Sequence, residues 1–512
     1  MLVKVYAAAL QGVNATLITI EVNCSKGIKF FLVGLPDVSI KESHERITSA
    51  LECYGMKFPR KQIVINMAPA DIRKEGAAYD LPLAIGVLAG AEKIKSEKVG
   101  DYLMMGELSL DGSLKPVRGV LPIAIKAKED GFKGMILPQA NAREAAVVNG
   151  LEVYGVENIG EVIRFFNEKT GLERTILDPR AEFYAGQAAL EWDFSEVKGQ
   201  ENVKRALEVA CAGGHNLLFV GAPGAGKSML AKRIPSILPP LSLSESLETT
   251  KIHSVAGKIN RNGSLIAVRP FRSPHHTISS VAMVGGGSFP QPGEISLAHN
   301  GVLFLDEIAE FNKNVLEVLR QPLEDRKITI SRAKTTVEYP AGFMLIASMN
   351  PCPCGHYNNP YKACVCMPQQ VQKYLNRLSG PLLDRIDIQI EIVPVPFEAI
   401  SSTRPSESSE KIRERVIAAR QVQEERFAGE QGIYCNAQMH TRLLHKHAQP
   451  DAAGLLQLKN AMERLSLSAR AYDRILRVAR TIADLDKSEN VLAHHIAEAI
   501  SYRNLDRENW AG

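Results

Sequence analysis

Residues 221–228 read GAPGAGKS and decide how the fold of this chain is interpreted. They match the G-x-x-x-x-G-K-[ST] pattern of phosphate-binding loops, and an apolar strand predicted over 216–220 and a helix predicted over 229–237 flank them as required. Backbone N–H groups of such a loop can surround phosphate oxygens, Lys227 can reach the β- and γ-phosphates, and Ser228 can bind Mg²⁺. The predicted nucleotide-binding residues are Gly221, Ala222, Pro223, Gly224, Ala225, Gly226, Lys227, Ser228 and Met229.

Two further apolar segments end in polar side chains. The segment GVLFLDE ends in Asp306 and Glu307, and a strand predicted over 343–348 is followed by Asn350. Because the carboxyl ends of parallel strands meet at one edge of a sheet, these groups are expected beside the phosphate-binding loop. There Asp306 would bind Mg²⁺, Glu307 would polarise the attacking water, and Asn350 would orient that water or sense the γ-phosphate. Taken singly, each has a plainer interpretation, as a strand end at the surface or a turn residue before proline.

The composition and length of the chain disfavour several classes of function. The chain has 512 residues, which suggests about three domains. Its 61 Lys and Arg against 57 Asp and Glu leave a net charge of +4, which disfavours a protein that coats nucleic acid by bulk charge but permits a local basic patch. No apolar run is long enough to span a membrane, and the N-terminus lacks the pattern of a secretion signal. We therefore expect a cytoplasmic protein without a membrane partner.

The sequence pattern divides the chain into three parts and predicts a multidomain α/β fold class. Residues 1–185 alternate short strands with helices, which indicates an α+β domain, and residues 177–192 lack periodicity and are the predicted linker. Residues 186–395 contain the phosphate-binding loop and predict a P-loop α/β core. Residues 396–512 are rich in Arg, Glu, Gln and Ala and predict a helical region that follows a polar loop over 401–410.

Two insertions in the core carry candidate DNA contacts. The interval between Lys227 and Asp306 exceeds what one helix and one strand need, so an insertion is predicted over about 240–295. Its density of Gly and Pro predicts a projecting loop or hairpin, and residues 327–339 alternate like two short strands. The candidate DNA-binding residues are His275, His276, Arg332 and Lys334. On the residues alone, an ordinary solvated hairpin fits as well as contact with a polyanion.

Four of the eight cysteines crowd into a predicted loop over 351–367, as two C-x-C pairs separated by nine residues. The four are Cys352, Cys354, Cys364 and Cys366. Four thiolates can hold a tetrahedral Zn²⁺ that fixes a loop without a core of its own. The spacing departs from the commoner C-x₂-C, His356 could replace one thiol, and a redox or merely packed set of thiols is the alternative.

The order of the three strand-terminal elements resembles that of AAA+ ATPases, in which Asn350 would occupy the sensor 1 position. The segment GPLLDRID, residues 380–387, is similar to the one that carries the arginine finger in the magnesium-chelatase and replicative-helicase branch. The resemblance implies that Arg385 reaches the γ-phosphate of a neighbouring subunit and that Arg470 occupies the sensor 2 position. An arginine finger that acts on a neighbouring subunit implies a homo-oligomer. The resemblance implies that this oligomer is a hexamer formed with ATP and DNA. Each arginine could instead be an ordinary surface ion pair.

Residues 71–150 resemble the proteolytic domain of Lon, which has an α+β fold like that of domain 2 of ribosomal protein S5. The matching stretches include KEGAA before Tyr79 and the segment around Gly119. The position of the catalytic serine falls on Ala78 and that of the lysine on Leu121. A Ser–Lys dyad needs both side chains, so protease chemistry is predicted to be absent and the domain to be a scaffold or binding surface.

Together with SPHH, VGGG, NPCPCG and SARAYDRILRVARTIADL, these segments resemble the YifB/ComM group of magnesium-chelatase-like AAA+ proteins. In this group the inserted hairpins would be the helix-2 insert and the pre-sensor-1 hairpin of a central pore. The resemblance implies an ATP-driven DNA helicase that acts in branch migration and homologous recombination during natural transformation. Its partners would be single-stranded or branched DNA, with recombination proteins as candidates. A magnesium-chelatase-type motor subunit with a protein partner, an ATP-dependent protein remodeller or protease, and a non-catalytic nucleotide-binding scaffold remain as alternatives.

Overall fold

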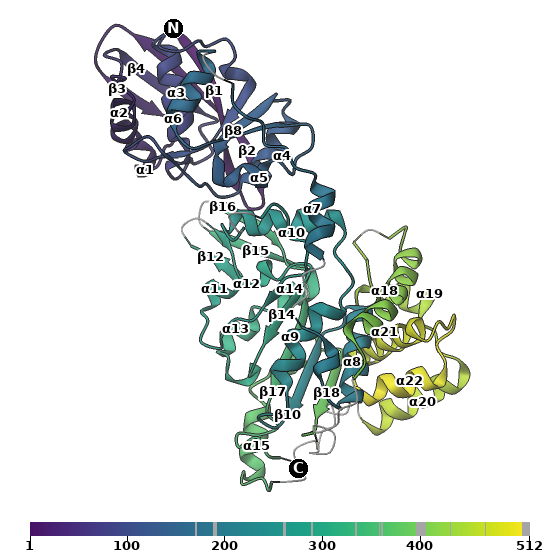
Figure 1. Ribbon diagram of the computed structural model, residues 1–512. Coiled ribbons are helices and arrows are strands. Elements are labelled where there is room, and N and C mark those ends of the chain that lie inside the picture. Colours follow the sequence, from purple (N-terminus) through teal and green to yellow (C-terminus); the bar gives the residue numbers. More distant parts are fainter. Residues whose placement is uncertain are drawn as a thin grey trace.

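The computed structural model describes residues 1–168, 171–187, 192–259, 263–287, 290–332, 335–357, 359, 362–395, 406–430, 432–465 and 467–503, with the side chains of Arg332 and Thr335 left out. Figure 1 shows an N-terminal sheet with its helices at one end, the P-loop core in the middle, and the C-terminal helices against one side of the core. None of the helices in the described part of the chain is long and apolar enough to cross a membrane.

The N-terminal part is built on a seven-stranded mixed sheet in the order β3-β4-β2-β1-β5-β8-β9. Its strands are β1 (Leu2–Gln11), β2 (Asn14–Ser25), β3 (Phe30–Val33), β4 (Gln62–Ala68), β5 (Tyr102–Met104), β8 (Gly134–Pro138) and β9 (Glu152–Val156), with a small hairpin of β6 (Glu107–Leu108) and β7 (Leu114–Lys115). Its helices are α1 (Val38–Lys41), α2 (Ser43–Cys53), α3 (Asp80–Gly90), α4 (Val120–Glu129), α5 (Ala142–Ala145) and α6 (Ile159–Phe166). Every residue of α3 is buried, because the helix lies under β1 and β2. The predicted mixture of strands and helices is confirmed.

The P-loop core contains a five-stranded parallel sheet in the order β11-β14-β17-β10-β18. Its strands are β10 (Leu217–Gly221), β11 (Phe271–Arg272), β14 (Val302–Leu305), β17 (Met344–Met349) and β18 (Ile388–Ile392), and helices α8 (Glu201–Gly213) and α9 (Lys227–Ile237) flank β10 in sequence. All residues of β10, β14 and β17 are buried. Such continuous apolar strands are typical of parallel sheets covered on both faces.

The insertion between α9 and β14 departs in part from the predicted projecting loop. It contains α10 (Leu243–Val255), α11 (Ser280–Val284), α12 (Glu294–Leu297) and a two-residue hairpin of β12 (Gly285–Gly286) and β13 (Gln291–Pro292). Within it, β11 pairs with β14 as the edge strand of the core sheet. Arg269 is held against the core because it donates hydrogen bonds to the Pro239 and Asn300 carbonyls at 2.7 and 2.8 Å. A two-residue strand among prolines gives no periodic signal, so the sequence pattern did not reveal it.

The predicted second hairpin is present as β15 (Lys327–Arg332) and β16 (Thr335–Pro340). Helices α13 (Lys313–Glu317) and α14 (Arg320–Asp325) precede it. The N-terminal sheet contacts this hairpin: a Cβ added at Gly12, in the β1–β2 turn, would lie 2.7 Å from Val337 Cγ1. A second contact joins α4 to α10, where the Gly119 N–H donates to the Ser254 carbonyl at 3.0 Å.

The C-terminal part is helical, as predicted. It contains α18 (Ser409–Arg426), α19 (Thr441–His447), α20 (Ala452–Arg464), α21 (Ala469–Leu485) and α22 (Ala493–Ser501). Two shorter helices, α15 (Pro368–Leu375) and α16 (Gly380–Leu383), precede β18 and belong to the core. The predicted linker is partly wrong, because α7 (Pro179–Gln187) forms within it. Its Phe183 is buried against Leu241 and Ala267, and this tertiary contact supplies the stability that the weak local pattern did not indicate.

Candidate nucleotide site and cysteine cluster

The phosphate-binding loop connects β10 to α9 as predicted. Gly224 and Gly226 adopt φ angles of +79° and +90°, in the left-handed region that favours glycine. The Lys227 ammonium is buried in this loop and donates to the Gly221 carbonyl at 2.7 Å and the Ala222 carbonyl at 3.0 Å. Burial lowers the pKa of Lys227, and the nearby carboxylates of the strand end oppose that shift. The lysine therefore fills the cradle that a phosphate would occupy.

The ends of β10, β14 and β17 bring the predicted polar groups together. Lys227 donates to Asn350 Oδ1 at 3.0 Å, and the Ser228 hydroxyl donates to Asp306 Oδ2 at 2.7 Å. Hydroxyl and carboxylate oxygens are the ligands that Mg²⁺ prefers, so Ser228 and Asp306 fit the predicted cation. The geometry thus groups Lys227, Ser228, Asp306 and Asn350 at the carboxyl edge of the sheet.

Ser348 joins this group although sequence reasoning did not select it. Its hydroxyl donates to Asp306 Oδ1 and accepts the Glu307 N–H at 3.2 Å. Its position as a polar residue inside the apolar run of β17 was the available signal. Ser348 therefore fixes both acids of the neighbouring strand end.

Glu307 is exposed at the end of β14. It adopts a φ of +52°, which is uncommon for a residue with a side chain and costs about 1–3 kcal/mol. Its carboxylate has no hydrogen-bond or ion-pair partner within the described residues. A carboxylate that is left free beside a phosphate-binding loop can orient and polarise a water molecule.

Arg385 lies at the opposite edge of the sheet from the P-loop. Because β18 runs parallel to β10, with Ile388 beside Leu217, the residues before β18 lie beside the start of β10. The Asn216 side chain donates to the Arg385 carbonyl at 2.9 Å, roughly 16 Å along the strand from Gly221. The Arg385 guanidinium is nearly buried and pairs with Glu324. It therefore does not face the P-loop of its own chain.

Two carboxylates of the same segment pair with helix α21. Arg470 Nη1 lies 3.4 Å from Asp384 Oδ2, and Arg474 Nη1 lies 2.9 Å from Asp387 Oδ1. Burial raises the pKa of Asp387, but the charge of Arg474 and the neighbouring His215 ring outweigh it and hold that pKa well below its usual range. The structure thus places Arg470 beside the segment that carries Arg385 and does not bring it to the P-loop. Arg474 and Asp387 escaped sequence reasoning because they are far apart in the chain.

Three family descriptions match in succession: subunit ChlI of Mg-chelatase over residues 20–141, magnesium chelatase, subunit ChlI, over 193–400, and its C-terminal part over 406–503. Competence protein ComM of Haemophilus influenzae is 43% identical over 508 residues, 98% of this chain and 97% of that protein. The uncharacterized protein YifB of Escherichia coli is 44% identical over 507 residues, again 98% and 97%.

The chain belongs to the YifB/ComM group of magnesium-chelatase-like AAA+ proteins. Membership confirms the resemblance predicted from the sequence and supports an ATP-binding protein and an ATPase of this group. Its parallel sheet with a P-loop agrees with that assignment.

The likeness of this YifB/ComM-group chain to Lon is partial. Lon protease 2 of Bacillus subtilis is 32% identical over 124 residues, which are 24% of this chain and 22% of that protein. Ala78 is half-buried and Leu121 is fully buried, and the Leu121 N–H donates to Glu144 at 3.1 Å. The two positions carry no nucleophile and no base, as the sequence predicted.

The structure describes some of the candidate DNA-binding residues of the two insertions and not others. The rings of His275 and His276 lie 4.0 Å apart, and His275 is exposed. Arg332 ends β15, and Lys334 lies outside the described residues. The two insertions touch, because the Tyr339 hydroxyl of β16 donates to the Pro290 carbonyl at 2.6 Å.

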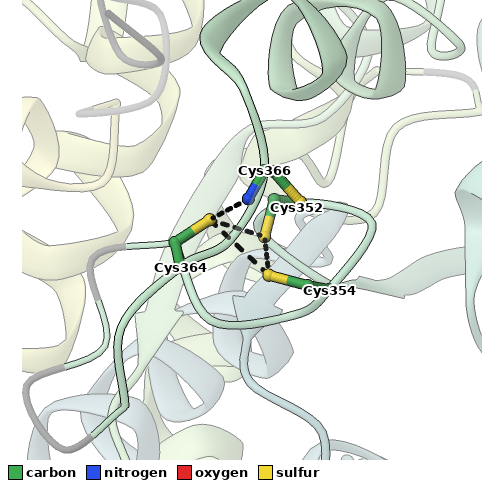
Figure 2. Close-up of side chains that lie close together, drawn as sticks. All are labelled: Cys352, Cys354, Cys364 and Cys366. Atoms are coloured by element: carbon green, nitrogen blue, oxygen red, sulfur yellow. Dashed lines mark hydrogen bonds between the residues drawn. The ribbon is translucent and has the colours of Figure 1, made fainter.

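The four clustered thiols converge in one loop, as Figure 2 shows. The Cys352 sulfur lies 3.3 Å from that of Cys354 and 3.7 Å from that of Cys364, and the last two are 3.5 Å apart. All four ligand atoms, that of Cys366 included, lie within 4.8 Å of one another. Four thiolates about 2.3 Å from Zn²⁺ would be about 3.8 Å apart, so the donor set fits zinc.

The pKa values of the clustered thiols diverge, because burial and the neighbouring thiols raise the pKa of Cys364 to about 12 and also raise that of Cys366. Burial raises the pKa of Cys354, but backbone N–H groups of Val365 and His356 and the neighbouring thiols outweigh it and lower that pKa to about 6. The cluster also touches the nucleotide site, since a Cβ at Gly355 would lie 2.5 Å from Pro223 Cδ. The loop that a metal would fix therefore packs directly on the phosphate-binding loop.

Proposed function

We propose that this protein is an ATP-driven DNA motor that assembles as a hexamer and catalyses strand separation or branch migration during recombination. The observation that carries the motor proposal is the split of the catalytic residues between two edges of one sheet. Lys227, Asp306 and Asn350 lie at the carboxyl edge, whereas Arg385 lies at the amino edge. A complete site then needs a second subunit that presents its own Arg385.

The residues of the site have separate tasks in this proposal. Lys227 and the loop N–H groups would bind the phosphates, and Ser228 and Asp306 would hold Mg²⁺, which supplies charge neutralisation when bound. Glu307 would accept the proton of the attacking water, and Asn350 would orient that water against the γ-phosphate. Arg470, beside the segment of Arg385, would serve the same neighbouring site, and the C-terminal helices would act as its lid.

DNA as the substrate rests on the relatives and on the hairpins. The Haemophilus influenzae relative is named a competence protein, and competence concerns the uptake of DNA. The β15–β16 hairpin ends in basic residues, which could hold phosphates when repeated around a ring. The proposed site of action is the cytoplasm, where chromosomal DNA and recombination proteins are found.

The test measures ATP hydrolysis and strand displacement on single-stranded, forked and three-strand DNA. We expect DNA to stimulate hydrolysis and ATP to drive displacement, with the Glu307→Gln variant inactive in both assays. Hydrolysis that does not respond to any of these DNAs would contradict the proposal.

A narrower prediction concerns the tip of the hairpin. Lys334→Ala is expected to reduce the stimulation of hydrolysis by DNA several-fold while leaving hydrolysis without DNA unchanged, because the residue is far in sequence from the P-loop and would act only on phosphates of DNA. Steady-state rates with and without single-stranded DNA measure both effects. Thr336→Ala, in the adjoining strand, is the control. Equal stimulation of mutant and wild type would remove Lys334 from the DNA contacts.

A second proposal assigns a structural Zn²⁺ to Cys352, Cys354, Cys364 and Cys366. Protein purified without oxygen is expected to hold about one Zn²⁺ per chain, and a Cys352→Ser/Cys364→Ser variant close to none. Cys53→Ser, which changes an exposed thiol outside the cluster, should keep its zinc. Elemental analysis by mass spectrometry measures the metal. Because Gly355 packs on Pro223, we also expect chelation to weaken ATP binding. Wild-type protein without zinc would refute the assignment.

A magnesium-chelatase-type motor subunit is the second candidate function, favoured by the family descriptions that match all three parts of the chain. Such a subunit would act with a protein partner. Stimulation of hydrolysis by DNA in the purified protein, with no partner present, separates the two candidates.

A further inference from the structure

One end of the N-terminal sheet is strongly basic. Five cationic residues belong to two short loops, the one between β2 and β3 and the one before β4: Lys26, Lys29, Lys57, Arg60 and Lys61. Residues 22–33 and 53–68, which contain these loops, include no Asp or Glu. In the described part of the chain, none of the five side chains has an ion-pair or hydrogen-bond partner. We call these five residues the basic end.

The strand pairing brings the two loops together. Ser25, the last residue of β2, pairs with Gln62, the first residue of β4, and the Ile63 N–H donates to the Lys29 carbonyl at 2.8 Å. The backbone nitrogen of Met1 donates to the Cys24 carbonyl at 2.9 Å, which places the start of β1 beside the end of β2. The positive charges therefore gather at one place, where no carboxylate of the described residues pairs with them.

The sheet next to the basic end has an open face. The register of β1, β2, β4 and β3 aligns Leu2, Asn23, Val64 and Phe31 in one row. The side chains of Leu2 and Phe31 are 59% and 45% exposed, whereas their neighbours on the other face, such as Val3 and Ile63, are buried. The row crosses three strand spacings, about 14 Å, which is enough for two or three stacked bases.

Aromatic packing fixes this platform from beneath. Phe30 points to the covered side, where its ring lies 4.9 Å from that of His44, and the His44 ring lies 4.7 Å from that of Phe58. Phe58 stands between Lys57 and Arg60 and so holds the basic loop to the sheet. The surface is therefore preformed, with Phe31 on the exposed side and the cations at its rim.

We infer that the basic end and the open row beside it bind single-stranded nucleic acid independently of the motor hairpins. Unpaired cations around an exposed aromatic ring on a rigid sheet can bind backbone phosphates and stack bases without reading sequence. These residues lie on loops and strands, and not on an amphipathic helix of the kind that binds a lipid surface. The identity of the polyanion as DNA rests on the proposed function.

The position of the basic end gives this binding a separate role. The other end of β1 reaches the turn at Gly12, which contacts Val337 of the β15–β16 hairpin. The ten residues of β1 span about 30 Å, and Figure 1 shows the N-terminus at the end of the molecule away from the P-loop core. A DNA strand bound at the basic end is thus held at a distance from the β15–β16 hairpin. The basic end would then capture DNA before or after the motor acts on it.

The test compares two full-length variants with the same change of charge. Lys26→Gln/Lys29→Gln/Lys61→Gln alters the basic end, and Lys93→Gln/Lys128→Gln/Lys133→Gln alters exposed lysines elsewhere in the N-terminal part. Binding of a fluorescent 30-nucleotide oligothymidylate is measured without nucleotide over a range of salt concentrations. We expect the first variant to bind at least about tenfold more weakly than wild type, with a salt slope reduced by about 2, and the control to match wild type. Phe31→Ala should weaken binding at least about fivefold with an unchanged slope, because it removes stacking and no charge.

Equal affinities of both triple variants would overturn the inference. A second result would also overturn it: the variant of the basic end binds oligothymidylate normally but no longer binds poly-glutamate or phosphatidylglycerol vesicles. Loss of poly-glutamate binding would assign the surface to an acidic protein segment, and loss of vesicle binding would assign it to anionic lipid. The assay needs no hydrolysis, so it is independent of the motor proposal. If DNA fails to stimulate hydrolysis but the basic end still binds it, only the motor proposal fails.

Discussion

Replacing Arg385 with Ala is expected to lower ATP turnover of the assembled protein by about 10³-fold or more, the effect of removing an arginine that stabilises charge on the transferred phosphoryl group. The expectation follows from the sheet. Arg385 precedes β18, at the edge opposite the P-loop of its own chain, so in the proposed assembly it would complete the site of another subunit. Because the P-loop of the variant is intact, its affinity for ATP should stay close to that of the wild type.

A mixing experiment gives this prediction its sharpest form. Lys227→Ala subunits cannot bind the phosphates but still present Arg385, whereas Arg385→Ala subunits bind ATP without a finger. Each variant alone should be nearly inactive, and mixtures should regain turnover at sites where the two kinds of subunit meet. Glu324→Gln is the matched control, because it removes the ion pair of Arg385 and keeps the guanidinium. An inactive mixture, or normal turnover of Arg385→Ala alone, would contradict action in trans.

The nucleotide site was predictable because parallel sheets have a strict geometry. In the sequence, one apolar run leads into the phosphate-binding loop and two others end in polar residues, and parallel pairing places all three ends at one edge of the sheet. The hydrogen bonds of Ser228 with Asp306 and of Lys227 with Asn350 follow from that arrangement. Ser348 was missed because a single serine in a buried strand does not reveal that its partner is the neighbouring carboxylate.

Other features depend on contacts between distant segments and could not be read from local patterns. The Arg474–Asp387 ion pair joins α21 to the segment before β18, and neither residue stands out from other charged residues in the sequence. The strand β11 is only two residues long, and its pairing with β14 rather than its composition makes it a strand. The basic end arises in the same way, since the register of β2 with β4 unites two loops that are separate in the chain.

Glu307→Gln is the second variant with a large expected effect, a loss of about 10²- to 10⁴-fold in ATP turnover with ATP binding retained. The amide has nearly the shape of the carboxylate but cannot accept a proton at neutral pH. The backbone of residue 307 should keep its place, because its N–H bonds to Ser348 and the side chain has no described partner to lose. Turnover is measured by phosphate release and binding by fluorescence of a labelled ATP analogue. Glu310→Gln, in the same loop but paired with Arg377 through a carboxylate at 2.8 Å, is the control and should keep near-normal turnover.

The retained binding makes this variant more informative than the loss of the P-loop lysine. Lys227→Ala should lose both binding and turnover, because its ammonium lies in the phosphate cradle itself. Glu307→Gln should instead accumulate with MgATP bound, and MgATP is what a trans finger recognises. We therefore expect Glu307→Gln to form the larger assembly with ATP and to keep it for hours, while the wild type returns to smaller species as ATP is consumed. Light scattering after gel filtration follows both. If Glu307→Gln hydrolyses ATP at the wild-type rate, the general base is another group; if it binds no ATP, Glu307 belongs to the binding site and not to the chemical step.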